Sequence, residues 1–273
     1  MMPASAPGLL APLDQKALER AFALLENPDF AARLAEYAGQ PVRRAMRVMP
    51  RPASDRLNRA AEAAIMKCLE LATRSIRPAS RRKPTMLLSS VLAGISGGVG
   101  GAFGIAALPV ELPLTTTLML RAIAAIARHH GEDLSTLEAR LACVEVFALG
   151  ARKSETGTCI GYYATRALLS RLAGEASAFL LERGMSSASA PVVTGVVAEI
   201  ATRFGVVVSE RAAAGALPAI GALGGAVVNV AFMNHFQRLA RGHFLMRRLE
   251  RRYGIAAVRR GYEALASRAS DAA

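Results

Sequence analysis

The chain contains a stretch of twenty-six residues, 85–110, without a single Asp, Glu, Lys, Arg or His. About 20 apolar residues are enough for a helix to cross a bilayer. Six glycines lie in this stretch, and Gly97 and Gly101 show the four-residue spacing that lets two helix backbones approach closely in lipid. The segment therefore predicts a membrane-inserted helix or, alternatively, a closely packed core helix of a soluble protein.

A second uncharged segment, residues 212–234, is twenty-three residues long. Basic residues are dense beside both segments: residues 43–83 hold twelve basic side chains against three acidic ones, and residues 238–260 hold eight arginines and one glutamate. With a net charge of +13, such a surface prefers an anionic partner, for example phospholipid headgroups. The residues that we expect to contact lipid, or to bring helices together within it, are Arg81, Arg82, Lys83, Gly97, Gly101, Gly221, Gly225, Arg241, Arg247 and Arg248.

Composition narrows the class of partner and the compartment. Aromatic residues are 5% of the chain, Trp is absent, and neither a zinc-finger nor an RNP motif occurs, so we expect no nucleic-acid partner. Three cysteines without CxxC spacing, Cys68, Cys143 and Cys159, indicate buried thiols in a reducing compartment. Residues 1–13 lack the basic and apolar regions of a secretory signal. We therefore expect a cytoplasmic protein that meets the inner membrane from the inside.

Apolar residues recur at helical spacing along the whole chain, and no strand run is bounded by hairpin signals. We expect an all-α multi-helix bundle that includes the two Gly-rich apolar segments. Proline, glycine and capping residues place the helix ends. They predict helices that begin near Asp14, Ser54, Pro113, Ser135, Gly161 and Pro191, a helix end at Gly131, and a stretch at Val206–Val208 that could be extended.

The same signals divide the chain into three regions. Pro41, Pro50 and Pro52 indicate a linker, so residues 1–53 are expected to form an N-terminal helical arm and linker. Residues 54–262 are expected to form the main helical domain, and residues 263–273 a disordered tail.

Several polar residues lie in apolar surroundings. Glu145 has apolar neighbours on every side, so its carboxylate should be protonated or paired, with Arg121 or Arg140 as the partner. Ionisable groups in such places are either functional or form buried ion pairs that fix helix packing. Glu199 and Arg203 have the spacing of a helical ion pair. The full set of buried polar candidates is Glu111, Arg121, Glu145, Glu199, Arg203, Glu210, Asn229 and His235.

Catalytic and metal motifs are weak. Residues 94–98 match the G-x-S-x-G pattern around Ser96, and Glu210 and His235 follow in the order of a hydrolase triad. However, the strand and helix that should surround this motif are missing from the sequence pattern, and glycine is so frequent here that a chance match is easy. His129 and His130 are adjacent and would point about 100° apart on a helix, so we expect no metal site and no cofactor.

A set of motifs in residues 54–262 is similar to the EcsC family of bacterial proteins, and the later motifs resemble its proteobacterial branch. The resemblance implies a helical protein of unassigned biochemical activity that is associated with membranes, and it supplies no catalytic residues. The motifs are Leu108–Pro113, Thr115–Arg121, Glu145–Gly150, Gly161–Arg166, Arg203–Glu210, Ile220–Ala222, Asn229, His235–Gln237, Ala240–Phe244 and Arg247–Arg251.

Together, these features predict a membrane-associated, lipid-binding helical protein rather than an enzyme. We expect its basic clusters to dock on anionic lipid while the Gly-rich segments insert, and a membrane protein or a second copy of the chain is a further possible partner. The alternative is a soluble hydrolase that uses buried carboxylates or Ser96.

Overall fold

The computed structural model describes residues 10–26, 51–74, 108–150, 161–183, 191–215 and 221–271. Every regular element in these ranges is a helix, which confirms the prediction of an all-α multi-helix bundle. The elements are α1 (Pro12–Leu25), α4 (Arg51–Arg74), α6 (Leu108–His129), α7 (Leu137–Glu145), the short 3₁₀ helix η2 (Val146–Gly150), α8 (Gly161–Arg183), α9 (Pro191–Gly215), α10 (Gly221–Tyr253) and α11 (Ile255–Asp271).

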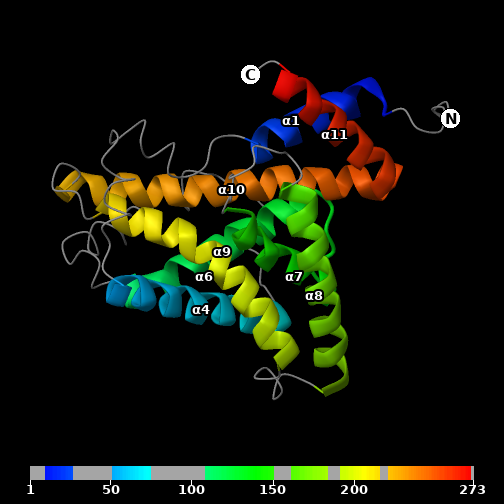
Figure 1. The fold of residues 1–273 in the computed structure, drawn as a ribbon. Helices are drawn as coiled ribbons and strands as arrows, with labels where there is room; N and C mark the ends of the chain where they lie inside the picture. The colour runs from blue at the N-terminus through cyan, green and yellow to red at the C-terminus, as the bar shows by residue number, and fades with distance from the viewer. Residues whose placement is uncertain are drawn as a thin grey trace.

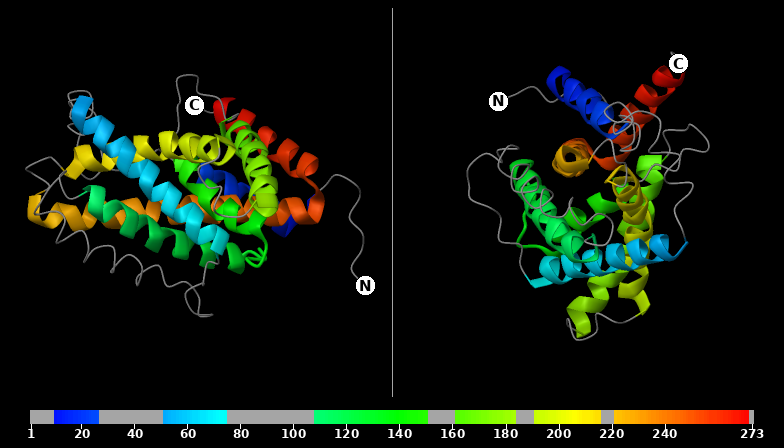
Figure 2. Two further views of the ribbon diagram at one scale, coloured as in Figure 1. Left: turned by 90° about the horizontal axis from the view of Figure 1, so that it is seen from below. Right: turned by 90° about the vertical axis from the view of Figure 1, so that its left-hand side faces the viewer.

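Helix α10 is the longest of these elements and runs through the middle of the molecule (Figure 1). Helices α1 and α11 lie on one side of it, and α4, α6 and α9 lie on the other side (Figures 1 and 2). Helix α1 packs on both α10 and α11, so the two ends of the described chain meet along α10. The first described helix is therefore a surface layer over α10 and not part of the larger bundle beneath it.

The core beneath α10 is built around four fully buried phenylalanines from η2, α9 and α10. The ring centroid of Phe147 lies 5.2 Å from that of Phe204 and 5.4 Å from that of Phe236, and Phe232 lies 5.2 Å from Phe236. A Cβ on Gly150 would approach the Phe236 ring to 2.9 Å, so only glycine lets η2 pack this closely. The core of the bundle therefore depends on aromatic packing against small residues.

Most predicted helices are present, and some of their ends differ from the prediction. Helix α1 begins with Pro12 at its first position, where a missing N–H is harmless, and Asp14 is not its cap. Helix α4 begins at Arg51, before Ser54, and α6 begins at Leu108 with Pro113 inside it. Helix α7 is capped by Thr136, whose side chain accepts a hydrogen bond from the Ala139 N–H, instead of Ser135.

Two further expectations are wrong. Val206–Val208 is helical within α9, where Val207 and Val208 are buried in the core and Val206 lies on the exposed side of the helix. The expected tail is helical as far as Asp271, because α11 buries Val258, Tyr262 and Ala266 on one face.

The apolar segments fall partly outside the described residues. Only 108–110 of the first segment are described, at the start of α6, whereas the second contributes the end of α9 and the start of α10. Within the described residues, none of the helices combines the length and the hydropathy that crossing a membrane requires.

Candidate functional site

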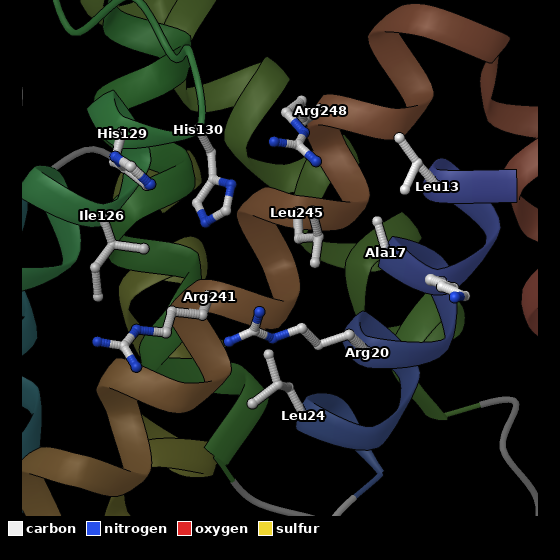
Figure 3. A pocket seen from close by; sticks show the side chains of 11 residues that line it. Leu13, Ala17, Arg20, Leu24, Ile126, His129, His130, Arg241, Leu245 and Arg248 are labelled. Carbon is white, nitrogen blue, oxygen red and sulfur yellow. The ribbon is translucent and has the colours of Figure 1, made fainter. Parts of the chain in front are cut away.

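A pocket of about 660 Å³ lies between α1, the end of α6 and the C-terminal half of α10 (Figure 3). No Asp or Glu is among the described residues that line it. Its basic residues are Lys16, Arg20, His129, His130, Arg241 and Arg248, and its apolar residues are Leu13, Ala17, Leu24, Ile126 and Leu245. The site therefore combines concentrated positive charge with an apolar wall.

Helix α1 supplies one wall because its two faces differ. Leu18, Ala21 and Leu25 are buried on the face toward α10 and α11, whereas Lys16 and Arg20, four residues apart, line the pocket. The helix packs very closely: a Cβ on Gly242 of α10 would lie 2.7 Å from Leu25, and one on Gly261 of α11 would lie 2.7 Å from Leu18.

Polar contacts fix the first turn of α1 to the end of α10. The Asp14 carboxylate accepts hydrogen bonds from the Tyr253 hydroxyl at 2.7 Å and from Arg252 at 2.8 Å. The Tyr253 hydroxyl also accepts a hydrogen bond from the Ala11 N–H at 3.3 Å. Asp14 is therefore an attachment point of the α1 wall rather than a helix cap.

The end of α6 supplies the second wall. Gly131, with φ of +84°, ends the helix as predicted. The Gly131 N–H bonds to the Arg128 carbonyl and the Glu132 N–H to the Ala127 carbonyl, which is the paired pattern of a Schellman motif. This turn leaves His129 and His130 at the pocket and directs Glu132 toward α10.

Helix α10 supplies the third wall through Arg241, Leu245 and Arg248, which repeat at helical spacing on one face. The neighbouring Arg247 turns away and binds both oxygens of Glu132, at 2.9 and 3.1 Å, and Arg251 binds the same carboxylate. Burial would raise the pKa of Glu132, but the hydrogen bonds and charges of these arginines outweigh it and lower that pKa. Arg247 and Arg251 thus connect the end of α6 to α10, whereas Arg241 and Arg248 line the pocket.

The charges of the basic lining shift the pKa values of its own members. Burial, together with the charges of Arg248, His129, Arg241 and Arg251, lowers the pKa of His130 to about 4. Burial and the charge of Arg20 likewise lower the pKa of Arg241. Positive charge is therefore crowded in this pocket, which favours entry of an anion.

A separate polar cluster lies where α8 meets α10. Arg166 binds Glu250 at 2.5 Å, and the Tyr163 hydroxyl donates to the same carboxylate at 3.2 Å. The buried Tyr162 hydroxyl lies 3.1 Å from Nδ1 of His243, whose pKa burial holds well below its usual range. Nε2 of His243 is buried without a hydrogen-bond partner among the described residues, whereas the shared contacts of Glu250 are typical of a cluster that fixes how two helices pack.

Glu145 lies near this cluster, and the predicted partner is wrong. Arg121 is exposed to solvent on α6, because its position falls on the outer face of that helix, and it cannot bury a charge with Glu145. Burial raises the pKa of Glu145, against the opposing charges of Arg247 and Arg166. Of the two states expected from the sequence, protonated or paired, the structure favours the protonated one. Arg140, the other suggested partner, bonds to the carbonyls of Leu134 and Ser135.

A third buried cluster joins α6, α9 and α10. Arg211 binds the Glu111 carboxylate at 2.6 Å, and the Asn229 amide donates to the same oxygen at 3.0 Å. The Arg211 guanidinium also lies 5.1 Å from the centroid of the Phe232 ring. Glu111 and Asn229 were predicted as buried polar residues, and the arginine that connects them was not.

The remaining predicted residues are distributed over the bundle. Glu199 and Arg203 form the predicted ion pair at 2.7 Å, and Arg203 also donates to Thr165. Glu210 and His235 are buried, and Gly221 and Gly225 lie in the first turns of α10. Of the residues that the sequence singled out, those that lie outside the described part of the chain are Arg81, Arg82, Lys83, Ser96, Gly97, Gly101 and Cys159. Cys68 and Cys143 are buried free thiols, as expected.

The prediction named Arg241 and Arg248 but missed four basic residues of the pocket: Lys16, Arg20, His129 and His130. A signal for Lys16 and Arg20 exists in the sequence, because their four-residue spacing places them together on a helix face that does not carry Leu18 and Leu25. Their meeting with α10 depends on tertiary packing over more than two hundred residues of chain, which no local pattern predicts.

Comparison with known proteins and families gives a match to one protein family. No match was found among curated proteins or among solved structures. The model of the EcsC protein family matches residues 17–249, which begin within α1 and end within α10 and so include the lining residues of the pocket except Leu13 and Lys16. The chain belongs to the EcsC protein family.

Proposed function

We propose that this protein binds anionic phospholipid at the cytoplasmic face of the inner membrane, through the pocket between α1, α6 and α10, and that it acts by binding rather than by catalysis. The observation that carries the proposal is the lining of the pocket, with four Lys or Arg side chains, two histidines and no acidic residue among those described. Phosphate groups are the anions that such a lining recognises best.

The rim of the pocket supports a membrane as the source of the anion. Leu13, at the start of α1, lines the pocket beside its basic residues and is 82% exposed. An exposed apolar residue beside basic ones is the arrangement that inserts shallowly between headgroups while the basic residues bind phosphate. The proposal therefore assigns Leu13 to the acyl boundary and Lys16 and Arg20 to the headgroups.

The expected strength is modest. Each basic side chain near an anionic surface contributes about 1 kcal/mol, so the four Lys and Arg residues would give about 4 kcal/mol, a reversible interaction in the millimolar range that salt weakens. Stable association then requires additional contacts, for which the basic flanks of the two Gly-rich segments remain the predicted source.

The test is co-sedimentation of the full chain with vesicles of phosphatidylglycerol mixed with phosphatidylcholine, and with vesicles of phosphatidylcholine alone. The pocket variant combines Arg241→Gln and Arg248→Gln. Its matched control combines Arg171→Gln and Arg268→Gln, which remove the same charge from exposed positions on α8 and α11, outside the basic flanks of the Gly-rich segments. We expect the pocket variant to bind anionic vesicles about 30-fold more weakly and the control to lose much less.

Two outcomes would contradict the proposal. One is equal loss in both variants, which would show that only net charge matters. The other is recovery of the wild-type chain in the supernatant with both kinds of vesicle at physiological salt.

A further inference from the structure

We infer that the pocket holds a single anionic phospholipid molecule, with its phosphate between Arg20 and Arg241 and the start of its acyl part against the apolar wall. This inference rests on the proposed function and adds the stoichiometry and the part of the lipid that is recognised. It differs from surface docking because one molecule enters a defined site, with contacts to its head and to its chain.

The size of the pocket argues for more than an ion. At about 660 Å³ it lies well within the range of roughly 300–1,000 Å³ that is typical of sites for small organic ligands. An inorganic phosphate would leave most of this space unfilled. A ligand that fills it needs a substantial uncharged part in addition to the anion.

The arrangement of the charges places the phosphate. Arg20 extends from α1 toward α10, and Arg241 extends from α10 toward the α6 side of the pocket, close enough for the charge of Arg20 to act on it (Figure 3). Guanidinium groups present paired N–H donors that match phosphate oxygens. A phosphate between them would replace a repulsive contact by two attractive ones, and Arg248 and His130 lie along the same cavity.

The apolar lining of the pocket indicates where the acyl chain of the lipid lies. The almost fully buried Ile126 and Leu245 offer little open surface, so the apolar surface available to a ligand belongs to the half-buried Ala17 and Leu24 and the exposed Leu13 of α1. A headgroup alone would leave these side chains beside water or beside charge. An acyl chain would cover them and gain free energy in proportion to the apolar area that it removes from water.

The inference can be tested with a lipid that is soluble as a monomer. The full chain is titrated calorimetrically with dihexanoyl phosphatidic acid below its micelle concentration. Dibutyryl phosphatidic acid tests whether the length of the acyl chains matters, and dihexanoyl phosphatidylcholine tests whether the net charge of the headgroup matters. Inorganic phosphate tests whether the anion binds without an apolar part. The variants are Arg20→Gln and Arg241→Gln, with Arg268→Gln at an exposed position of α11 as the control, and thermal unfolding verifies that each is folded.

We expect one molecule of dihexanoyl phosphatidic acid per chain, and weaker binding by tenfold or more in each pocket variant but not in the control. Each methylene that the pocket buries should strengthen binding by up to about fourfold, so the dibutyryl lipid should bind clearly more weakly. The phosphatidylcholine should bind poorly, because its choline cation would enter a cationic pocket.

Three outcomes would overturn the inference. If inorganic phosphate binds as tightly and with the same dependence on Arg20 and Arg241, the pocket is a site for a free anion. If both chain lengths bind equally, the apolar wall is not used. If the monomeric lipid does not bind while anionic vesicles still do, the pocket takes no single lipid, and the proposed membrane docking stands on its own.

Discussion

Arg20 on α1 and Arg241 on α10 line the same pocket, and burial together with the charge of Arg20 lowers the pKa of Arg241. Three other arginines have acidic partners: Arg247 and Arg251 share Glu132, and Arg166 binds Glu250. The pocket is different because its lining holds no described acidic residue. The fold thus brings basic side chains together at a pocket whose described lining has no acidic residue, as expected for a binding site for an anion.

The first prediction concerns the repulsion across the pocket. Replacing Arg20 by Gln should leave the unliganded chain equally stable or slightly more stable, by about 0.5 kcal/mol or less, because exposed charge pairs contribute little. The same change should weaken binding to anionic vesicles. Thermal unfolding and co-sedimentation on the same preparation check both effects. A clear loss of stability in the absence of lipid would mean that Arg20 supports the fold of α1 instead.

The second prediction concerns the buried pair Arg211 and Glu111. Arg211→Met should destabilise the fold by about 3–5 kcal/mol, because it leaves the Glu111 carboxylate buried with only the Asn229 amide. Adding Glu111→Gln should recover much of that loss, since the uncompensated charge is removed. A double-mutant cycle on denaturant unfolding measures the coupling. Additive effects would show that the two side chains do not depend on each other.

The third prediction concerns the protonation of Glu145. Its raised pKa means that the folded chain keeps a proton that the unfolded chain releases above about pH 4.3. Glu145 therefore lowers stability as pH rises above that value, until its folded-state pKa is passed. Glu145→Gln keeps the shape of the protonated side chain and should flatten this dependence, so that the variant is at least as stable as the wild type at pH 8.

Unfolding curves of both proteins at several pH values between 5 and 8 test this directly. A variant that becomes less stable than the wild type as pH rises would show that the ionised carboxylate has a partner. In that case Arg247 and Arg166, whose charges act on Glu145, are the residues to examine.

The fourth prediction concerns His130. Because its pKa is lowered to about 4, the unfolded chain binds a proton there before the folded chain does, and stability should fall as pH falls from about 6.5 toward 4. An anion in the pocket offsets the charges of Arg248 and Arg241 and should raise this pKa. The ring signals of His130, identified with a His130→Gln variant, should shift to higher titration pH when dihexanoyl phosphatidic acid is added. No shift with saturating lipid would place the anion elsewhere.

Local features of the sequence predicted much of the fold. Apolar spacing and capping chemistry predicted the helices that begin at Gly161 and Pro191 and the end of α6 at Gly131, because these depend on residues a few positions apart. The failures are of another kind. Pro12 rather than Asp14 begins α1, because the carboxylate of Asp14 binds Arg252 and Tyr253, which are far away in the sequence.

The candidate site was predictable only in part, for the same reason. The excess of arginine after residue 238 indicated Arg241, Arg247 and Arg248, but the sequence could not show that Glu132 would take up Arg247 and leave the other two at the pocket. Similarly, the apolar surroundings of Glu145 indicated burial, and the choice of Arg121 as partner failed because helix orientation, not sequence distance, decides which face is exposed.

The central claim is that α1 and α10 together hold anionic lipid, and hydrogen exchange tests it most directly. Exchange of α1 (residues 12–25) and of the C-terminal half of α10 is measured alone, with phosphatidylcholine vesicles and with vesicles that also contain phosphatidylglycerol. A ligand that contacts both helices must stabilise their docking, so both should exchange more slowly only with the anionic vesicles, and the protection should disappear in the Arg241→Gln, Arg248→Gln variant. Binding to anionic vesicles with unchanged exchange in α1, or with protection confined to other helices, would contradict the account.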